Sequence, residues 1–240
     1  MELFQSFIIL QFIAHFLSDF TFQTNKIAVN KNAKGFKTKY LYIHILVTFL
    51  FSYLLSFQWN FITGAVLIAL LHFMIDATKS YAMQKKIFTK YLFYIDQFLH
   101  FIIIILVVYF FQQKFTISDN LDIEKKYLLA ILGFIITAKP ANILIKEIFK
   151  TFNISVGDGG NIGDLPNAGK LIGIIERWLI LIFVIIGQFE AVGFLLASKS
   201  ILRYGDKDSN NPQKTEYVLI GTLLSFAIAV VVGLIIIKLK

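Results

Sequence analysis

The sequence predicts an all-α protein, a polytopic transmembrane bundle of seven or eight helical spans. The first observation is composition: 57% of the 240 residues are hydrophobic and only 16% are charged. In soluble domains roughly half of the residues are hydrophobic and about a quarter are charged. The second is a mean hydropathy of +0.72. The third is that the apolar residues form continuous stretches, long enough to cross roughly 30 Å of hydrocarbon as helices. These features exclude an ordinary soluble domain.

Seven stretches qualify as spans by their length and apolar content. They cover residues 3–22, 40–57, 61–75, 91–111, 127–145, 171–187 and 217–237. An eighth, 189–202, is marginal in length and carries Lys199. The first stretch begins directly after Met1 and Glu2, without the basic segment and cleavage site of a signal peptide, so we expect it to be retained. We expect one integral membrane domain over residues 1–240, with a four-helix half at 1–112 and a C-terminal half at 126–240.

The charges between these stretches predict the topology. Lysines crowd the segments after the first and third stretches, whereas the turn at 56–60 carries no charge. Because basic loops stay in the cytoplasm, this pattern places both lysine-rich segments inside and the N-terminus outside. The net charge of +8 is therefore interpreted as a topology signal, and no nucleic-acid partner is expected. Whether 189–202 crosses the membrane or re-enters it stays open.

Ionisable residues inside the first four stretches form a regular pattern. His15 and Asp19, His72 and Asp76, and Asp96 and His100 are pairs four residues apart, and His44 stands alone on the second stretch. Residues four apart share one helix face, and the predicted topology places all of them in one layer near the cytoplasm. An ionisable group at the bilayer centre costs roughly 2.5–3.5 kcal/mol on insertion scales, so a retained one normally has a partner and a function. We therefore expect these side chains to converge on a common point.

Four imidazoles and three carboxylates suit a divalent metal ion such as zinc, manganese or iron, and the absence of cysteine leaves no thiolate ligand. The candidate ligands are His15, His44, His72, Asp76, Asp96 and His100. Asp19, Asp76 and Asp96 are candidates for a catalytic general base acting on metal-bound water. The alternative is polar glue, in which each histidine hydrogen-bonds its own aspartate across a turn and His44 is a satisfied core residue. Three pairs in one layer favour the metal site.

The C-terminal half adds cations at a similar predicted depth. They are Lys139, Arg177, Lys199 and Arg203, and Lys139 stands directly before Pro140, which predicts a kink. We interpret them as a substrate-binding rim for an anionic or lipid-linked substrate. The alternative, given equal weight, is that they pair with Glu176, Glu190 or the site carboxylates. The glycine-rich segment 156–170 lacks the spacing of a phosphate-binding loop, so we expect a flexible lid or a plain turn there.

Several of these residues together resemble a known family. The pattern consists of Ala14-His-Phe-Leu-Ser-Asp-Phe-Thr-Phe-Gln23, His44, His72-x-x-x-Asp76-x-x-Lys79, Asp96-Gln-x-x-His100, Thr137-Ala-Lys-Pro140 and Ala168-Gly-Lys-Leu-Ile-Gly-x-x-Glu-Arg177. It is similar to the bacterial membrane-protein family catalogued as domain of unknown function 3307, and the likeness runs over nearly the whole chain. The resemblance implies a multi-pass protein of the bacterial inner membrane, without an assigned activity. A looser likeness of His-x-x-x-Asp on membrane helices to metal-dependent hydrolases implies a reaction class by analogy alone.

These observations leave three functions open. The leading hypothesis is a metal-dependent hydrolase of a membrane-associated phosphoester or amide, with its site facing the cytoplasm. A second is an ion- or proton-coupled transporter or channel that uses the same cluster, although few ionisable residues other than Glu190 occupy the outer halves of the spans. A third is a non-catalytic membrane partner whose metal is structural. Whether the protein is an enzyme stays open.

Overall fold

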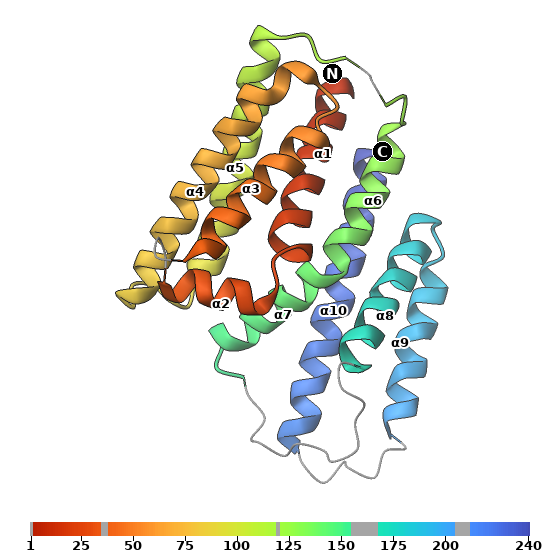
Figure 1. Ribbon diagram of the computed structural model, residues 1–240. Coiled ribbons are helices and arrows are strands. Elements are labelled where there is room, and N and C mark those ends of the chain that lie inside the picture. The colour runs from red at the N-terminus through yellow and green to blue at the C-terminus, as the bar shows by residue number, and fades with distance from the viewer. Residues whose placement is uncertain (1, 35–37, 119–120, 155–167, 205–211) are drawn as a thin grey trace. The chain divides into compact units, whose positions relative to one another are not determined.

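The regular structure is entirely helical in the computed structural model, which describes residues 2–34, 38–118, 121–154, 168–204 and 212–240. The prediction of an all-α fold is therefore confirmed. Ten α-helices, one π-helical segment and one short 3-10 helix occur in these ranges (Figure 1). They are α1 (Glu2–Phe16), η1 (Leu17–Thr21), α2 (Asn25–Lys34), α3 (Lys39–Leu54), η3 (Trp59–Phe61), α4 (Ile62–Gln84), α5 (Leu92–Lys114), α6 (Lys125–Thr137), α7 (Lys139–Thr151), α8 (Ala168–Ile185), α9 (Phe189–Tyr204) and α10 (Pro212–Leu239).

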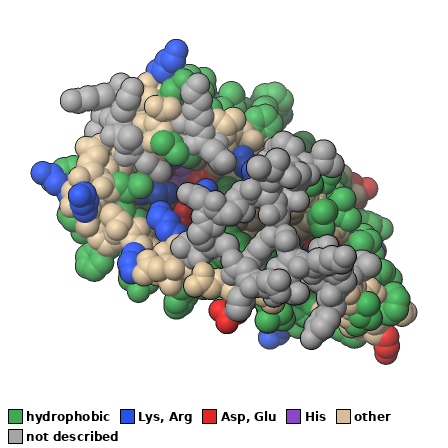
Figure 2. Space-filling model, turned by 90° about the horizontal axis from the view of Figure 1, so that it is seen from below, with side chains coloured by type: hydrophobic (Ala, Val, Ile, Leu, Met, Phe, Trp, Pro, Cys, Tyr) green, Lys and Arg blue, Asp and Glu red, His purple; other side chains and the backbone are tan. Residues whose placement is uncertain are grey.

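Four helical segments of the described residues are long and apolar enough to cross a membrane, as expected of a multi-pass membrane protein. They are Glu2–Thr21, Trp59–Gln84, Leu92–Lys114 and Thr215–Leu239. Helices α6 and α7 qualify as a fifth span if they are taken together, although they bend by 43° at their junction. Figure 2 shows many hydrophobic side chains exposed on the face seen from below. The described residues thus show four or five candidate spans, fewer than the expected seven or eight, and α3 is apolar but short.

The chain divides into two compact units, Met1–Leu132 and Gly133–Lys240. In the first unit α4 packs against both α3 and α5, and α1 packs against the same two helices. The four helices therefore surround a common interior. The short polar helix α2 packs on α4 and α3, across the lower end of these helices in Figure 1.

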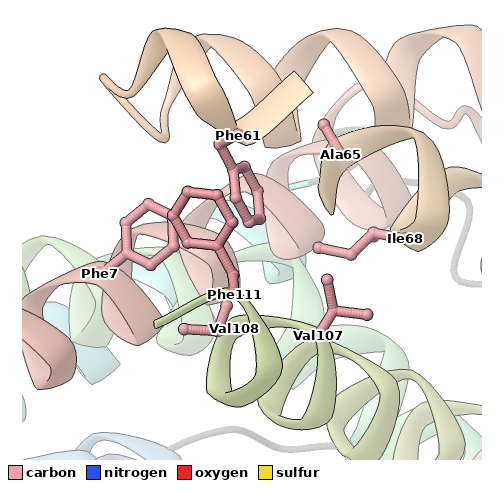
Figure 3. Close-up of a cluster of buried hydrophobic side chains, with 7 residues drawn as sticks. All are labelled: Phe7, Phe61, Ala65, Ile68, Val107, Val108 and Phe111. Carbon is pink, nitrogen blue, oxygen red and sulfur yellow. The ribbon is translucent and has the colours of Figure 1, made fainter. Parts of the chain in front are cut away.

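An aromatic cluster fills the first unit at one end of this interior (Figure 3). The rings of Phe7 and Phe111 both lie edge-on to Phe61, at 4.9 Å between centroids. Gly64 makes room for this packing, because a Cβ there would lie 2.4 Å from the Phe61 ring. Phe61 stands eleven residues before His72 on the same helical segment, so the cluster and the histidine lie roughly 16 Å apart along the helix.

The second unit contains a helix break that the sequence predicted at Lys139-Pro140. Helix α6 ends at Thr137 and α7 begins at Lys139 with Pro140 in its first turn. Pro140 has no N–H, so the break leaves carbonyl groups of α6 without helical partners. Helix α8 packs against α7, α9 and α10. Its contact with α10 is close, since a Cβ at Gly233 would lie 2.6 Å from Val184, as is typical of small residues between membrane helices.

Replacing Phe61 by alanine should lower the free energy of unfolding by roughly 3–5 kcal/mol, because the change empties a closely packed site. Trp59 is the matched control, since its side chain is 87% exposed and Trp59→Ala should have little effect. Unfolding by sodium dodecyl sulfate in mixed micelles measures both. Equal losses for the two variants would show that the cluster contributes no packing energy.

Candidate metal centre

The first unit brings together all four histidines and the three aspartates of the sequence pattern. Helix α1 supplies His15, η1 Asp19, α3 His44, α4 His72 and Asp76, and α5 Asp96 and His100. Their side chains are buried, and the most exposed is Asp19 at 7%. Convergence from four helices and the π-helical segment thus produces a buried polar cluster inside an otherwise apolar bundle.

A widened helical turn places Asp19 in this cluster. The chain leaves α1 after Phe16 and continues as a π-helix, closed by a hydrogen bond of 2.9 Å from Phe22 N to Leu17 O. Such π-helical turns inside helices occur mostly at functional sites. Ser18 Oγ lies 3.0 Å from Asp19 Oδ1 and can donate its proton there. Asp19 Oδ1 remains 3.6 Å from His15 Nδ1, so the π-helical turn keeps both residues on the same face.

Two imidazole nitrogens form the centre of the cluster. His44 Nε2 and His72 Nε2 lie 3.0 Å apart, and Asp19 Oδ1 lies 3.5 and 3.4 Å from them. Asp76 Oδ2 is 3.4 and 3.6 Å from the same two nitrogens. Ligands of a tetrahedral ion with bonds of roughly 2.0–2.1 Å are separated by about 3.3–3.4 Å. Each carboxylate therefore completes a triangle with the size of one face of a zinc coordination tetrahedron.

Further atoms extend this centre in both directions. Three groups of side chains place one ligand atom each within 4.8 Å of the others: His15, Asp19 and His72; His44, His72 and Asp76; and Asp76, Asp96 and His100. The first two groups share His72, and the last two share Asp76. Asp19, which the sequence suggested as a general base, is thus also placed as a possible ligand. These buried His/Asp groups can hold a metal ion.

Several atoms of the cluster have no hydrogen-bond partner within the described part of the chain. They are His15 Nδ1, Asp96 Oδ1 and both ring nitrogens of His100. The His100 ring stacks on that of His72, with 3.9 Å between centroids. A buried polar atom without a partner costs roughly 1–3 kcal/mol, so these atoms indicate that a ligand such as an ion or water belongs in the cluster.

Two lysines that the sequence analysis assigned to topology also enter the cluster. Lys31 Nζ, from α2, lies 2.7 Å from Asp76 Oδ2, and Lys79 Nζ, from α4, lies 2.7 Å from Asp96 Oδ2. The sequence held a signal for Lys79, because it follows Asp76 by three residues and shares its helix face. Nothing in the sequence distinguishes Lys31 from the other lysines near it. Figure 2 shows basic side chains gathered on this side of the molecule, with histidine and acidic groups in a hollow between them.

The lysines leave one carboxylate uncompensated. Asp19 has no lysine or arginine within ion-pair distance among the described residues, and its contacts are to Ser18 and to three imidazoles. A buried charge without an opposite charge is strongly unfavourable. Counted over the described residues and with neutral imidazoles, the cluster therefore carries one net negative charge, located at Asp19, which favours a bound cation.

The C-terminal candidates lie in the second unit, where two of them have structural partners. The Arg177 guanidinium is buried and donates to Thr137 O at 2.6 Å, Asn142 Oδ1 at 2.7 Å, Ser225 Oγ at 2.9 Å and Ala138 O at 3.3 Å. It therefore joins both sides of the α6–α7 break. Lys199 Nζ lies 2.5 Å from Glu176 Oε2, in the ion pair that the alternative interpretation predicted.

For Lys139, Arg203 and the segment 156–170, the structure gives less information. Lys139 begins α7 and is partly exposed. The side chain of Arg203 and most of the glycine-rich segment 156–170 lie outside the described residues. The substrate-binding role of all four cations stays a prediction.

Comparison with known proteins places the first unit in a family. A model described as "Protein of unknown function (DUF3307)" matches residues 7–130, which is just over half of the chain. The chain belongs to this family. The match includes every histidine and aspartate of the cluster, and it ends before Lys139. Searches of curated proteins and of solved structures found no match.

Replacing Lys31 by methionine should lower the free energy of unfolding by about 3–5 kcal/mol in the presence of a chelator, because Asp76 is left as an unpaired buried charge. The double variant Lys31→Met with Asp76→Asn should recover most of this loss, since the second change removes the charge. Unfolding in mixed micelles measures both variants.

Lys150 provides the control, because its ion pair with Glu147 is solvent-exposed. Lys150→Met should change the free energy of unfolding by less than about 0.5 kcal/mol. A Lys31→Met variant as stable as Lys150→Met would show that the Lys31–Asp76 contact does not compensate a buried charge.

Proposed function

We propose that the cluster holds one divalent metal ion in a membrane-embedded site and that the protein is a metal-dependent hydrolase. The observation that supports this most is the arrangement around His44 and His72, where carboxylate and imidazole atoms from η1, α3 and α4 lie 3.0–3.6 Å apart. The uncompensated charge of Asp19 adds an electrostatic reason for a cation. The donor set of histidine and aspartate suits zinc, manganese or iron.

The topology forms part of the proposal. We take the protein to cross the bacterial inner membrane seven or eight times, with α3 and α8 counted as spans, α9 as the eighth where it crosses, and the N-terminus outside. The buried cluster then faces the cytoplasm. The lysines of α2 and those that follow α4 support this orientation, because basic segments remain on the cytoplasmic side.

The substrate class follows from the chemistry that such a site supplies. A bound divalent ion polarises a phosphoryl or carbonyl oxygen and generates a nucleophile from water at neutral pH. We propose a membrane-associated phosphoester or amide, with an aspartate that is not a ligand acting as general base. Lys139, Arg177, Lys199 and Arg203 remain the proposed contacts for an anionic or lipid-linked substrate, although the hydrogen bonds of Arg177 support a structural role for that residue.

A transporter is the second candidate, and the ring contacts favour it. The imidazoles of His15, His100, His72 and His44 follow one another with centroid separations of 5.2, 3.9 and 5.0 Å. Such a series can relay protons or pass an ion between sites. A third candidate, a non-catalytic membrane partner, would use the same ion to hold its helices together.

Metal analysis of the detergent-purified protein should find about one divalent ion per chain. The double variant His15→Ala with His72→Ala should lose it, because it removes two members of one ligand group. Glu176→Gln is the matched control, since this carboxylate lies in the second unit and pairs with Lys199. A wild-type protein without an ion, or a double variant that keeps it, would contradict the proposal.

Activity separates the three functions. Purified protein should hydrolyse a chromogenic phosphodiester or anilide in detergent when zinc or manganese is added, and a chelator should abolish this. Proteoliposomes that contain a metal- or pH-sensitive dye should show no flux dependent on His72. Flux without hydrolysis would favour the transporter, and bound metal with neither activity would favour the structural role.

A further inference from the structure

Gln97 connects two members of the cluster and was not among the predicted site residues. It follows Asp96 on α5, and its Nε2 atom donates to Asp96 Oδ2 at 3.1 Å. Its Oε1 atom lies 3.3 Å from His15 Nε2. The side chain therefore bridges the carboxylate of one helix and the imidazole of another.

The contact to Asp96 determines which way the amide of Gln97 points. Asp96 Oδ2 also accepts from Lys79 Nζ at 2.7 Å, so this oxygen belongs to a carboxylate that can only accept. The NH₂ group of Gln97 must face it, because the reverse orientation would set two acceptors against each other. The amide oxygen of Gln97 is therefore the atom that faces His15.

The same logic fixes the proton on His15. An amide oxygen accepts and never donates, so His15 Nε2 must carry the hydrogen in the 3.3 Å contact. In a neutral imidazole the other nitrogen, Nδ1, then bears the lone pair. The orientation of a glutamine thus sets the tautomer of a histidine in the cluster.

The surroundings of Nδ1 show what this lone pair faces. His15 Nδ1 is buried without a hydrogen-bond partner in the described residues, and the nearest charged atom is Asp19 Oδ1 at 3.6 Å. That separation exceeds a hydrogen bond, and two lone pairs repel each other. It is close to the roughly 3.3–3.4 Å between two ligands of one tetrahedral ion.

We infer that His15 binds the metal ion through Nδ1, together with Asp19, and that Gln97 is the positioning residue that makes this nitrogen available. The contacts then form a series from Lys79 through Asp96 and Gln97 to His15 and the ion. Asp96 acts in this series through Gln97 as an outer partner of the ligand, as carboxylates commonly do around metal-bound histidines. The ligand role rests on the proposed metal site, whereas the tautomer does not.

The tautomer is measured first, in protein free of metal. Long-range proton–nitrogen NMR spectra of histidine-labelled protein in nanodiscs distinguish the Nδ1–H form, the Nε2–H form and the imidazolium, and His15→Gln assigns the His15 signals. We expect the Nε2–H form in the wild type. Titration with zinc should then shift His15 Nδ1 much more than Nε2.

Variants at position 97 test the positioning role. Gln97→Leu removes the acceptor, so His15 should populate both tautomers and zinc affinity should fall roughly 10- to 100-fold, the usual effect of losing an outer partner of a ligand. Gln11→Leu is the matched control, because Gln11 is buried on the same helix as His15 but bonds Ser52 instead. It should leave the tautomer unchanged and alter zinc affinity less than threefold.

Different results overturn different claims. An Nδ1–H or imidazolium form of His15 in metal-free wild-type protein would overturn this inference and leave the metal site standing. The inference would also be overturned if zinc shifted the Nε2 signal of His15 instead of Nδ1, or if Gln97→Leu and Gln11→Leu had the same effect on the His15 tautomer and on zinc affinity. A wild-type protein that binds no zinc would overturn the proposed function and the ligand role of Nδ1 together. The wild-type measurement needs no variant, so a failure of Gln97→Leu to fold does not prevent a decision.

Discussion

The burial of three carboxylates among apolar helices is the constraint on which the first unit depends. Each of them has to be balanced inside the bundle, because a charge in an apolar interior is strongly unfavourable without a partner. Lys31 and Lys79 balance two of them. The first of these pairs also explains the position of α2, a polar helix that Lys31 anchors to Asp76 and that Ser80 holds through a hydrogen bond to Lys31 O at 3.0 Å. The ion pair that compensates the charge of Asp76 is therefore also the contact that holds α2 in place.

The contacts within the cluster argue against simple polar glue. That interpretation requires each histidine to hydrogen-bond the aspartate on its own helix, but these three pairs are separated by 3.6, 3.6 and 3.9 Å, beyond hydrogen-bond distance. The shortest approach between cluster residues of the sequence pattern instead joins two imidazoles of different helices, at 3.0 Å. The cluster is therefore joined by contacts between different helices, including the hydrogen-bond contact between His44 and His72, and not by bonds between each histidine and the aspartate on its own helix.

The sequence predicted the parts of this arrangement that depend on local spacing. A separation of four residues identified the His–Asp pairs, continuous apolar stretches identified the helices, and Pro140 identified the break between α6 and α7. The sequence could not predict features that depend on tertiary contacts. Lys31 is one lysine among several in its segment, and only the packing of α2 brings it to Asp76. The π-helical turn at Asp19 leaves no mark in the periodicity, and apolar content alone does not decide whether a short helix such as α3 crosses the membrane.

Arg177 shows most clearly why a cation in a membrane helix is ambiguous in sequence. Its guanidinium has no carboxylate partner in the second unit as described, yet it donates to the carbonyls of Thr137 and Ala138 and to two side chains. In a membrane the carbonyls freed by a helix break must find donors within the protein, and a planar group with five N–H donors supplies several at once. Arg177 is therefore positioned by the need of these backbone carbonyls for hydrogen-bond donors.

If an anionic substrate binds this protein, the charge balance of the first unit offers a separate source of attraction. A divalent ion held beside this uncompensated carboxylate would leave one net positive charge at the site, and this excess would favour hydroxide or a phosphoryl oxygen as a further ligand.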